Sequence, residues 1–330
     1  MSLRRRIGAL LYDWPSFERN LRAGRWELIH NRAEIITTDG RAVRCEWKFT
    51  SELHIANVFP STSERLLSAA LRDWPITLRD DAPASADEPE ASFIIGHRGL
   101  ARLPHLLQTL RSIAAQRGAA IECIVVEQSM EREIESSLPK WVRYVHTPIP
   151  AAGFDYSRSW TFNAGAELAR GRVLILHDND MLVPDRYASE AVARVAGGAS
   201  FVDPKRFIFY LGEGDTRRVF DSGVLPSAAP STVVQNLHGG SVVATRDAYF
   251  AIGGFDESFV GWGGEDNDFR ERAEEHGGVY GFGHLPIVHL FHAPQKGKLQ
   301  GDDAPALRRY RELSAIPPRE RIARLRARRD

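Results

Sequence analysis

Apolar and polar residues alternate differently in two parts of the chain. Before residue 79, short apolar runs are separated by polar breaks, and Asp39 followed by Gly40 is a strong hairpin signal. This pattern predicts a small α+β module with a hairpin sheet over residues 1–78. Residues 79–90 are acidic, rich in Ala and Pro, and lack an apolar period, which predicts an exposed linker.

After the linker, apolar strand-like runs alternate with helical patterns, which predicts an α/β fold with a mainly parallel sheet flanked by helices. The run at 172–177 is wholly apolar in its middle, so we expect it to be a central strand. We expect one large domain over 91–303 and a basic helical tail over 304–330. The expected strands are 92–96, 121–126, 141–145 and 172–177, and the expected helices are 103–113 and 157–169.

Composition excludes some partners. The chain has 43 Lys and Arg residues against 43 Asp and Glu, so it lacks the basic field that non-specific nucleic-acid binding requires. Cys45 and Cys123 share no metal-ligand spacing, and we interpret them as reduced thiols in a cytoplasmic protein.

The N-terminal residues 4–17 combine three arginines with spaced apolar residues. Their apolar segment is too short for a signal peptide, and the sequence has no membrane-spanning run. Two interpretations stay open for this segment: a helix packed on its own domain, or a peripheral contact with the inner face of a membrane. The basic C-terminus has the same two interpretations, and a solvated surface is the default for it.

Polar residues cluster directly after three of the expected strands. Ligands of open α/β sheets bind outside the carboxyl ends of the strands, so these clusters are candidate site residues. Each cluster alone would be read as a turn, and the three in register favour a site. The clusters are Gly96, His97 and Arg98; Glu127 and Gln128; and Asp178, Asn179 and Asp180.

Asp178 and Asp180 place two carboxylates at the end of the central strand. Such a pair can reach a divalent ion, ribose hydroxyls or the water shell of the ion, and Mg²⁺ and Mn²⁺ take oxygen ligands together with substrate phosphates. His289 and His292 follow another apolar strand and can converge on the same ion if the chain turns there. Imidazole ligands would favour Mn²⁺ over Mg²⁺.

Trp262 stands between glycines that permit unusual backbone angles, which suits an aromatic lid over a sugar ring. Glu265, Asp266 and Asp268 follow in what we expect to be the first turn of a helix, where the helix dipole stabilises negative charge. A well-capped acidic helix would explain the carboxylates but not the tryptophan among glycines.

The sequence resembles glycosyltransferases of the GT-A fold, in particular the β-1,4-galactosyltransferases and the polypeptide N-acetylgalactosaminyltransferases. Four segments carry the resemblance: 161–171 leading into the strand before Asp178, then 239–246, 253–259 and 261–268. The last, with its Trp-Gly-Gly-Glu-Asp string, is the most specific. The resemblance covers about residues 91 to 295 and implies a Rossmann-like nucleotide-diphospho-sugar transferase fold.

The resemblance implies an inverting, metal-dependent transfer from a UDP-sugar to a saccharide, lipid-linked or glycoconjugate acceptor, as in polysaccharide biosynthesis. It assigns Asp266 as general base and Glu265 to acceptor hydroxyls, although the sequence cannot order the two. It implies metal ligation by Asp178, Asp180, His289 and His292. The implied acceptor residues are Trp262, Gly264, Glu265 and Asp266. The implied nucleotide-sugar contacts are Gly96, His97, Arg98, Glu127, Gln128, Asn163, Asp178, Asn179, Asp180, Gly240 and Trp262.

Leu237 and His238 stand where the galactosyltransferases have Tyr and Phe, so the sugar stays open among galactose, N-acetylgalactosamine and glucose types. A nucleotidyltransferase and a non-catalytic carbohydrate-binding protein are the alternatives. The first normally needs a glycine- and lysine-rich phosphate loop, which does not follow Ile95. The second is disfavoured because the full set of candidate acids and histidines is present.

Overall fold

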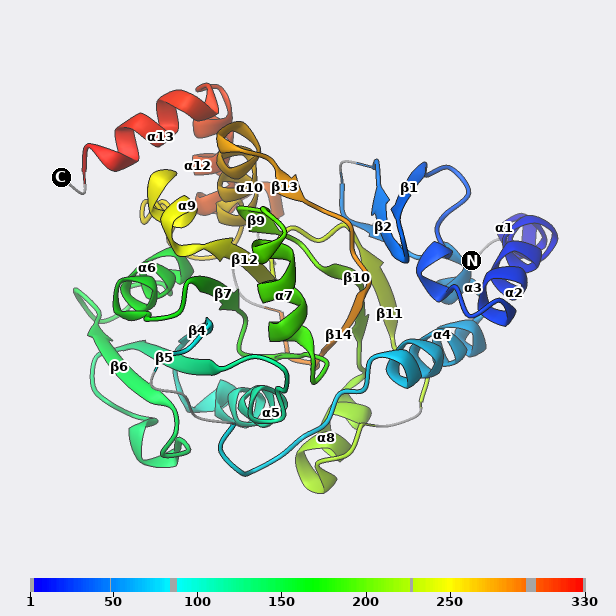
Figure 1. The fold of residues 1–330 in the computed structure, drawn as a ribbon, viewed down its shortest axis with the longest axis horizontal. Coiled ribbons are helices and arrows are strands. Elements are labelled where there is room, and N and C mark those ends of the chain that lie inside the picture. The colour runs from blue at the N-terminus through cyan, green and yellow to red at the C-terminus, as the bar shows by residue number, and fades with distance from the viewer. Residues whose placement is uncertain (1–2, 48, 84–87, 226–227, 295–300, 329–330) are drawn as a thin grey trace.

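The computed structural model describes residues 3–47, 49–83, 88–225, 228–294 and 301–328. A seven-stranded sheet forms its centre (Figure 1). The strand β7 is the fourth of the seven and pairs in parallel with β4, as its apolar sequence predicted. In order, the strands are β13 (Val279–Tyr280), β9 (Phe201–Val202), β12 (Ser241–Thr245), β7 (Val173–His177), β4 (Ala91–His97), β5 (Ile121–Ser129) and β6 (Arg143–Pro148).

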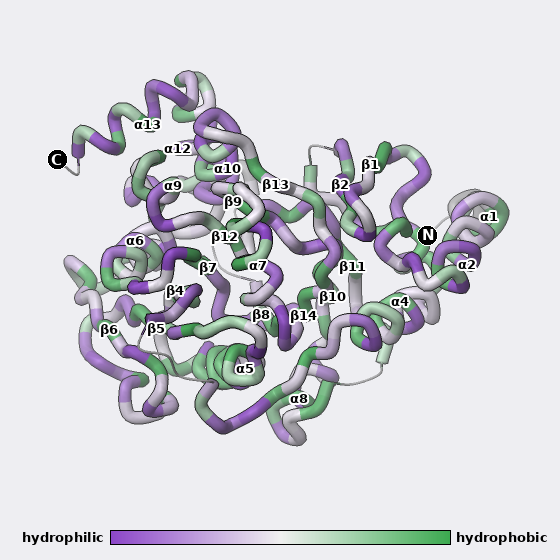
Figure 2. Tube along the Cα trace, in the orientation of Figure 1, coloured by the Kyte–Doolittle hydropathy of each residue, from purple (hydrophilic) through white to green (hydrophobic). Residues whose placement is uncertain are grey.

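Alternate side chains of the central strands enter two different cores, because successive residues of a strand point to opposite faces. Phe93 and Ile175 pack with α5 and α7 on one face. Ile94 and Leu174 pack with α6, α9 and α10 on the other. The tube in Figure 2 shows α5 as largely hydrophobic, as a helix buried on a sheet must be. These helices are α5 (Leu103–Ala114), α7 (Tyr187–Ala196), α6 (Arg158–Leu168), α9 (Arg246–Ala251) and α10 (Glu265–His276).

The predicted fold class, a mixed α/β sheet flanked by helices, is confirmed. Two expected strands differ by more than one residue at an end: β5 continues to Ser129 rather than ending at Val126, and β6 covers Arg143–Pro148 rather than 141–145. The residues just before β6 form a turn, in which Val142 donates its backbone N–H to the carbonyl of Pro139. As the edge strand of the sheet, β6 is only partly buried.

A second sheet of five strands joins the N-terminal residues to the rest of the chain. Strand β3 lies at its edge and pairs with β11, so a segment before residue 78 contributes to a sheet built mainly from the large domain. The order is β3 (Ser51–Glu52), β11 (Thr232–Gln235), β10 (Lys205–Tyr210), β14 (Leu285–His289) and β8 (Met181–Leu182).

The N-terminal helices and α8 share one hydrophobic core with this second sheet. Trp26 is fully buried there and its ring centroid lies 6.1 Å from that of Phe207 on β10. The predicted hairpin is present, since β1 and β2 pair antiparallel around Gly40. The elements are α1 (Leu3–Gly8), the π-helix η1 (Ala9–Asp13), α2 (Trp14–Arg22), β1 (Ile36–Asp39), β2 (Ala42–Cys45), α3 (His54–Val58), α4 (Pro60–Asp73) and α8 (Glu213–Ser222).

Two short helices, α12 (Pro305–Ser314) and α13 (Pro318–Arg326), end the chain and pack on α10. Arg321 is 3% exposed, and its guanidinium contacts Asp268 and Glu271 of α10 at 2.5 Å each. The expected C-terminal helical tail is therefore anchored to the domain at this arginine. Residues 84–87 of the expected linker lie outside the described residues.

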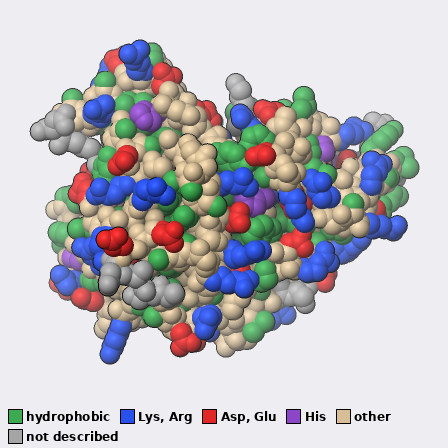
Figure 3. Space-filling model, viewed as in Figure 1, with side chains coloured by type: hydrophobic (Ala, Val, Ile, Leu, Met, Phe, Trp, Pro, Cys, Tyr) green, Lys and Arg blue, Asp and Glu red, His purple; other side chains and the backbone are tan. Residues whose placement is uncertain are grey.

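No helix among the described residues is long and apolar enough to cross a membrane. The apolar side chains Ile7, Leu10, Leu11 and Tyr12 are exposed on the first helical segment, and Figure 3 shows hydrophobic side chains gathered at that end of the molecule. Elsewhere on this face, Lys and Arg are interspersed with Asp and Glu. The peripheral membrane contact and the cytoplasmic location stay predictions. Cys45 and Cys123 are both free thiols.

Candidate active site

A cavity of about 750 Å³ opens at the carboxyl ends of the central strands. Ends of parallel strands meet at one edge of a sheet, so residues far apart in sequence gather there. Most of the site residues expected from the sequence line this cavity. They are Gly96, Arg98, Asp178, Asn179, Asp180, Gly240, Trp262, Gly264, Glu265, Asp266, His289 and His292.

Strand pairing brings Asp180 to the two histidines. In the antiparallel pair β8 and β14, Met181 lies opposite His289, and Leu290 donates its backbone N–H to the carbonyl of Asp180 at 2.9 Å. Asp180, His289 and His292 therefore each offer one ligand atom, and these atoms lie within 4.8 Å of one another. A carboxylate oxygen and two imidazole nitrogens form a donor set suited to Mn²⁺.

Asp180 is surrounded by basic side chains. Its Oδ2 lies 2.8 Å from a guanidinium nitrogen of Arg102 and 3.3 Å from Nε2 of His292, and its Oδ1 lies 3.8 Å from Nε2 of His289. Burial opposes its charged form, but these three partners outweigh burial and lower the pKa of Asp180. Tyr210 stacks on the ring of His289 at 4.3 Å, which fixes the orientation of that imidazole.

Asp178 also lines the cavity, where it contacts Arg158. The guanidinium Nε of Arg158 donates to Oδ1 of Asp178 at 2.7 Å. Burial raises the pKa of Asp178 to about 6, and the cation only partly offsets this. The structure thus separates the two carboxylates: Asp180 belongs to the histidine cluster, whereas Asp178 is paired with a buried arginine.

The expected acidic helix is present as α10, which begins at Glu265. Asp266 accepts a hydrogen bond from Arg158 at 2.5 Å, and Glu265 lies 3.7 Å from the same guanidinium. Burial, followed by the neighbouring charge of Asp266, raises the pKa of Glu265 to about 7. The two carboxylates differ in exposure, because the side chain of Asp266 is 24% exposed and that of Glu265 only 10%.

Trp262 lines the cavity between glycines whose backbone is left-handed. Gly261, Gly263 and Gly264 have φ values of 86°, 106° and 92°, which side chains with a Cβ rarely adopt. A Cβ at Gly264 would also lie only 2.6 Å from the Cβ of Tyr310. Helix α12 therefore lies directly against the loop that carries Trp262.

A second glycine pair allows the acids to approach the sheet. Asp178 donates its backbone N–H to the carbonyl of Gly240 at 2.8 Å, which ties the two loops together. A methyl group at Gly239 would overlap the carboxylate of Asp266. Gly240 has φ +85°, and a Cβ there would meet Met181. Both positions thus require glycine for the observed geometry.

Two family models match this part of the chain. Glycosyl transferase family 2 matches residues 101–252, and the model described as the N-terminal domain of galactosyltransferase matches residues 224–292. Together they span the histidine cluster, the two glycine loops and α10. The chain carries a glycosyltransferase domain of the GT-A fold. The enzyme class and family resemblance expected from the sequence are confirmed by these matches.

The fold is similar to that of a known structure, GalNAc-T7 with UDP, GalNAc and Mn²⁺, with a TM-score of 0.50 and 14% identity. The match covers 70% of this chain and 48% of that chain, so the chain spans about half the length of this relative. A mannosyltransferase from Pyrobaculum calidifontis in complex with GDP-Man and Mn²⁺ matches with a TM-score of 0.43 and 14% identity, covering 81% of each chain. The comparison with curated proteins found no match.

Four of the expected site residues do not line the cavity of the glycosyltransferase domain. Asn163 is buried in α6, where it donates to the carbonyl of Phe255 and accepts from Tyr249. Glu127 is also fully buried, and it accepts a hydrogen bond from Tyr144 at 2.5 Å. These contacts give Asn163 and Glu127 packing partners within the protein.

His97 and Gln128 lie behind the cavity and orient residues that line it. His97 is buried, which lowers its pKa to about 4, and its Nδ1 lies 2.9 Å from the side-chain nitrogen of Asn179. Gln128 receives hydrogen bonds from Arg98 through both its backbone carbonyl and its side-chain oxygen. Arg98 lines the cavity, but its guanidinium already donates to Gln128 and Phe154.

Sequence reasoning missed Arg158 and Arg102. Ser157 caps α6 by accepting a hydrogen bond from the backbone N–H of Trp160, so Arg158 stands in the first turn of the helix. A cation there opposes the helix dipole and needs a compensating partner. This unfavourable position was the available signal for Arg158. Arg102 directly precedes α5, so the same signal was available for it.

Proposed function

We propose that this protein transfers a hexose or N-acetylhexosamine from a UDP-sugar to a saccharide or glycoconjugate acceptor, with inversion at the anomeric carbon. One observation carries the proposal: the Asp180, His289 and His292 cluster and the Glu265 and Asp266 pair open into the same cavity of about 750 Å³. The metal-binding set suits the half of the site that would hold the donor, and the two carboxylates suit the half that would hold the acceptor.

At the donor end, Asp180, His289 and His292 would hold a divalent ion, preferably Mn²⁺ because two of the three donors are imidazole nitrogens. When bound, such an ion neutralises charge on the leaving nucleoside diphosphate. Arg102, which contacts Asp180 at 2.8 Å, adds a second positive charge to this end. We assign Asp178 and Asn179, which line the same end, to the nucleotide-sugar.

At the acceptor end, we assign Asp266 as the general base that takes the proton from the attacking hydroxyl. Its carboxylate is held by Arg158 through Oδ1, and it is the more exposed of the two acids of α10. Glu265, which accepts a hydrogen bond from the backbone of Gly263 at 3.1 Å, would hold acceptor hydroxyls, with Trp262 above the sugar. Its pKa of about 7 makes Glu265 the alternative base.

The experiment is a panel of UDP-sugars incubated with the full chain, Mn²⁺ and saccharide acceptors, with UDP release as the readout. We expect acceptor-stimulated UDP release with at least one donor and a β-linked product from an α-linked donor, identified by NMR. An α-linked product would overturn inversion. Release of pyrophosphate from a sugar phosphate and UTP would instead identify a nucleotidyltransferase, and saccharide binding without any release would identify a carbohydrate-binding protein.

A further inference from the structure

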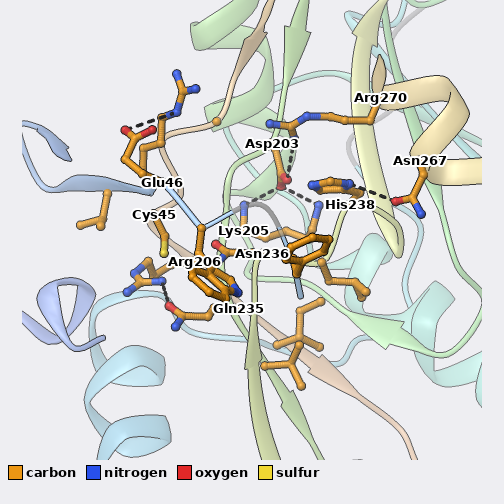
Figure 4. Close-up of a pocket in the computed structure, with 18 of the residues that line it drawn as sticks. Cys45, Glu46, Asp203, Lys205, Arg206, Gln235, Asn236, His238, Asn267 and Arg270 are labelled. Carbon is orange, nitrogen blue, oxygen red and sulfur yellow. Dashed lines mark hydrogen bonds and ion pairs between the residues drawn. The ribbon is translucent and has the colours of Figure 1, made fainter. Parts of the chain in front are cut away.

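A second cavity, of about 560 Å³, lies beside the catalytic one. The two cavities share three lining residues, Leu237, His238 and Asn267. Nδ1 of His238 and Oδ1 of Asn267 lie 3.2 Å apart, and Figure 4 shows this contact. A ligand that begins in the catalytic cavity can therefore continue into the second one.

Helix α10 runs from the catalytic cavity to the second one, so that its successive residues line one and then the other. Asp266 lines the catalytic cavity, Asn267 lines both, and Arg270 and Glu274 line the second cavity one and two turns further along. The proposed base and the second cavity are thus on one rigid element. A molecule lying along this face of α10 would present one end to Asp266.

Strand β2 and the residues after it also line the second cavity, and the family matches do not cover them. Trp47 and Phe49 line the cavity, and their rings are 48% and 69% exposed. The ring centroids lie 6.2 Å apart in an edge-to-face arrangement. Flat exposed aromatic faces are suited to the apolar C–H faces of sugar rings, because they provide contact area at low conformational cost.

The charged groups of this cavity compensate one another. Lys205 contacts Asp203 at 2.5 Å, Arg270 lies 3.5 Å from the same carboxylate, and Figure 4 shows both cations converging on it. Arg44 lies 3.8 Å from Glu46. The remaining cation of the lining, Arg206, donates to the backbone carbonyls of Glu27 and Ile29 and to the side-chain oxygen of Gln235. The guanidinium groups and the lysine are thus already engaged within the protein, and the lining holds four Lys or Arg against four Asp or Glu, which favours a neutral, hydroxyl-bearing ligand.

Asn236 lines the cavity, and its side-chain amide carries hydrogen-bond donors. Its side-chain nitrogen is buried and has no hydrogen-bond partner among the described residues. Among the described residues, Asn236 is also the one non-glycine residue with a positive φ, which is 59°. Asparagine adopts this left-handed conformation at little cost, so the buried amide without a partner is the feature that is typical of a position that contacts a ligand.

We propose that this second cavity binds the non-reacting part of a neutral oligosaccharide acceptor, stacked on Trp47 and Phe49, while the terminal hydroxyl lies at Asp266. This inference rests on the proposed glycosyl transfer and assigns its substrate class. It also gives residues 43–47 and Phe49 a function, namely to extend the acceptor site.

The test compares mono-, tri- and pentasaccharides of the neutral acceptor series that gives the highest UDP release. In the unchanged protein, the acceptor KM should fall with chain length. In the double variant Trp47→Ala and Phe49→Ala, the pentasaccharide KM should rise roughly tenfold, the worth of a lost aromatic contact. Donor hydrolysis, donor KM and the monosaccharide KM should stay unchanged. Tyr12→Ala, an exposed aromatic that lines neither cavity, is the matched control.

A pentasaccharide KM equal to that of the monosaccharide, or unchanged in the double variant, would overturn the inference while leaving the proposed transfer standing. Saturation-transfer NMR with neutral chito-, cello- and maltopentaose provides a readout without turnover. There, a signal that is lost in the double variant supports the inference, and no signal from any of the three overturns it. Failure of the proposed function is separate, since it would appear as absent UDP release with every donor.

Discussion

Arg158 links carboxylates from two segments that line the cavity of about 750 Å³. Its guanidinium is 11% exposed and lies among three carboxylates, those of Asp178, Glu265 and Asp266. These charges raise the pKa of Arg158 further above its usual value despite its burial. Without this cation, three acids would face one another in a buried site, where unpaired charge is strongly destabilising.

We predict that Arg158→Met lowers the free energy of unfolding by about 3 to 5 kcal/mol at pH 8. Loss of the cation raises the pKa values of Asp178 and Glu265 above their present values of about 6 and 7. Stability from such groups is present at low pH and is lost as pH rises through the folded pKa, so the deficit should be smaller at pH 5. Urea unfolding at the two pH values measures it.

The exposed Arg319→Met serves as the control for this variant and should leave stability within about 0.5 kcal/mol. A deficit in Arg158→Met that is equal at pH 5 and pH 8 would contradict the charge-pairing account. In that case, the guanidinium would stabilise the fold by packing alone, for example through its position over the ring of Phe162.

Asp266→Asn should lower turnover by a factor of about 10² to 10⁴, which is the usual contribution of a positioned base. UDP affinity in the presence of Mn²⁺ should change little, because the candidate metal ligands are Asp180, His289 and His292 and do not include Asp266. Glu265→Gln should mainly raise the acceptor KM. Steady-state kinetics and UDP calorimetry provide the two readouts.

Glu275→Gln, an exposed acid of the same helix, is the matched control and should behave as the unchanged protein. Full activity in Asp266→Asn would transfer the role of base to Glu265. The pH profile then decides, because the charge of Asp266 contributes to the raised pKa of Glu265. If Glu265 is the base, Asp266→Asn should move the acidic limb of the profile below pH 7.

At the scale of the elements, the turn at Gly239 lies directly against the carboxylate of Asp266 at the start of α10. We predict that Gly239→Ala lowers turnover at least tenfold and stability by about 1 to 3 kcal/mol, because the added methyl displaces the Asp266 carboxylate. Gly212→Ala is the control: its φ of −76° suits alanine and no atom lies within 4 Å of the added Cβ. Equal activity of the two variants would contradict the observed position of Asp266.

Helices and strands with a clear apolar period could be predicted from the sequence, whereas contacts between elements far apart in the chain could not. The apolar run before Asp178 identified the central strand, and the acids after Gly264 identified the helix start. The approach of Asp180 to His289 depends on the pairing of β8 with β14, and β8 has only two residues. So short a strand leaves no period in the sequence.

At the scale of the whole molecule, the C-terminal helices pack against the loop that carries Trp262 and against the start of α10. Arg321 joins α13 to Asp268 and Glu271, while Tyr310 of α12 lies against Gly264. We predict that Arg321→Met lowers stability by about 1 to 3 kcal/mol and also lowers turnover, since removing one partner leaves a buried acid less well satisfied. Arg324→Met, which breaks only an exposed pair with Glu320, should alter neither.

Thermal unfolding and kinetics of the two variants measure this effect. Loss of stability in Arg321→Met with unchanged turnover would mean that the helices stabilise the fold without supporting the loop that carries Trp262. Composition and periodicity predicted these helices, but their packing on α10 depends on Arg321, one of several similar arginines in a basic segment. Sequence alone does not distinguish the buried arginine from its exposed neighbours.

The central claim is that Asp180, His289 and His292 form the metal end of a nucleotide-sugar site. Calorimetric titration of UDP tests it most directly, with Mn²⁺ and with a chelator, in the unchanged protein, in His292→Ala and in the exposed control His276→Ala. We predict at least tenfold tighter UDP binding with Mn²⁺ in the unchanged protein and in His276→Ala, and loss of that gain in His292→Ala. Equal UDP affinity with Mn²⁺ and with chelator in the unchanged protein would contradict the account.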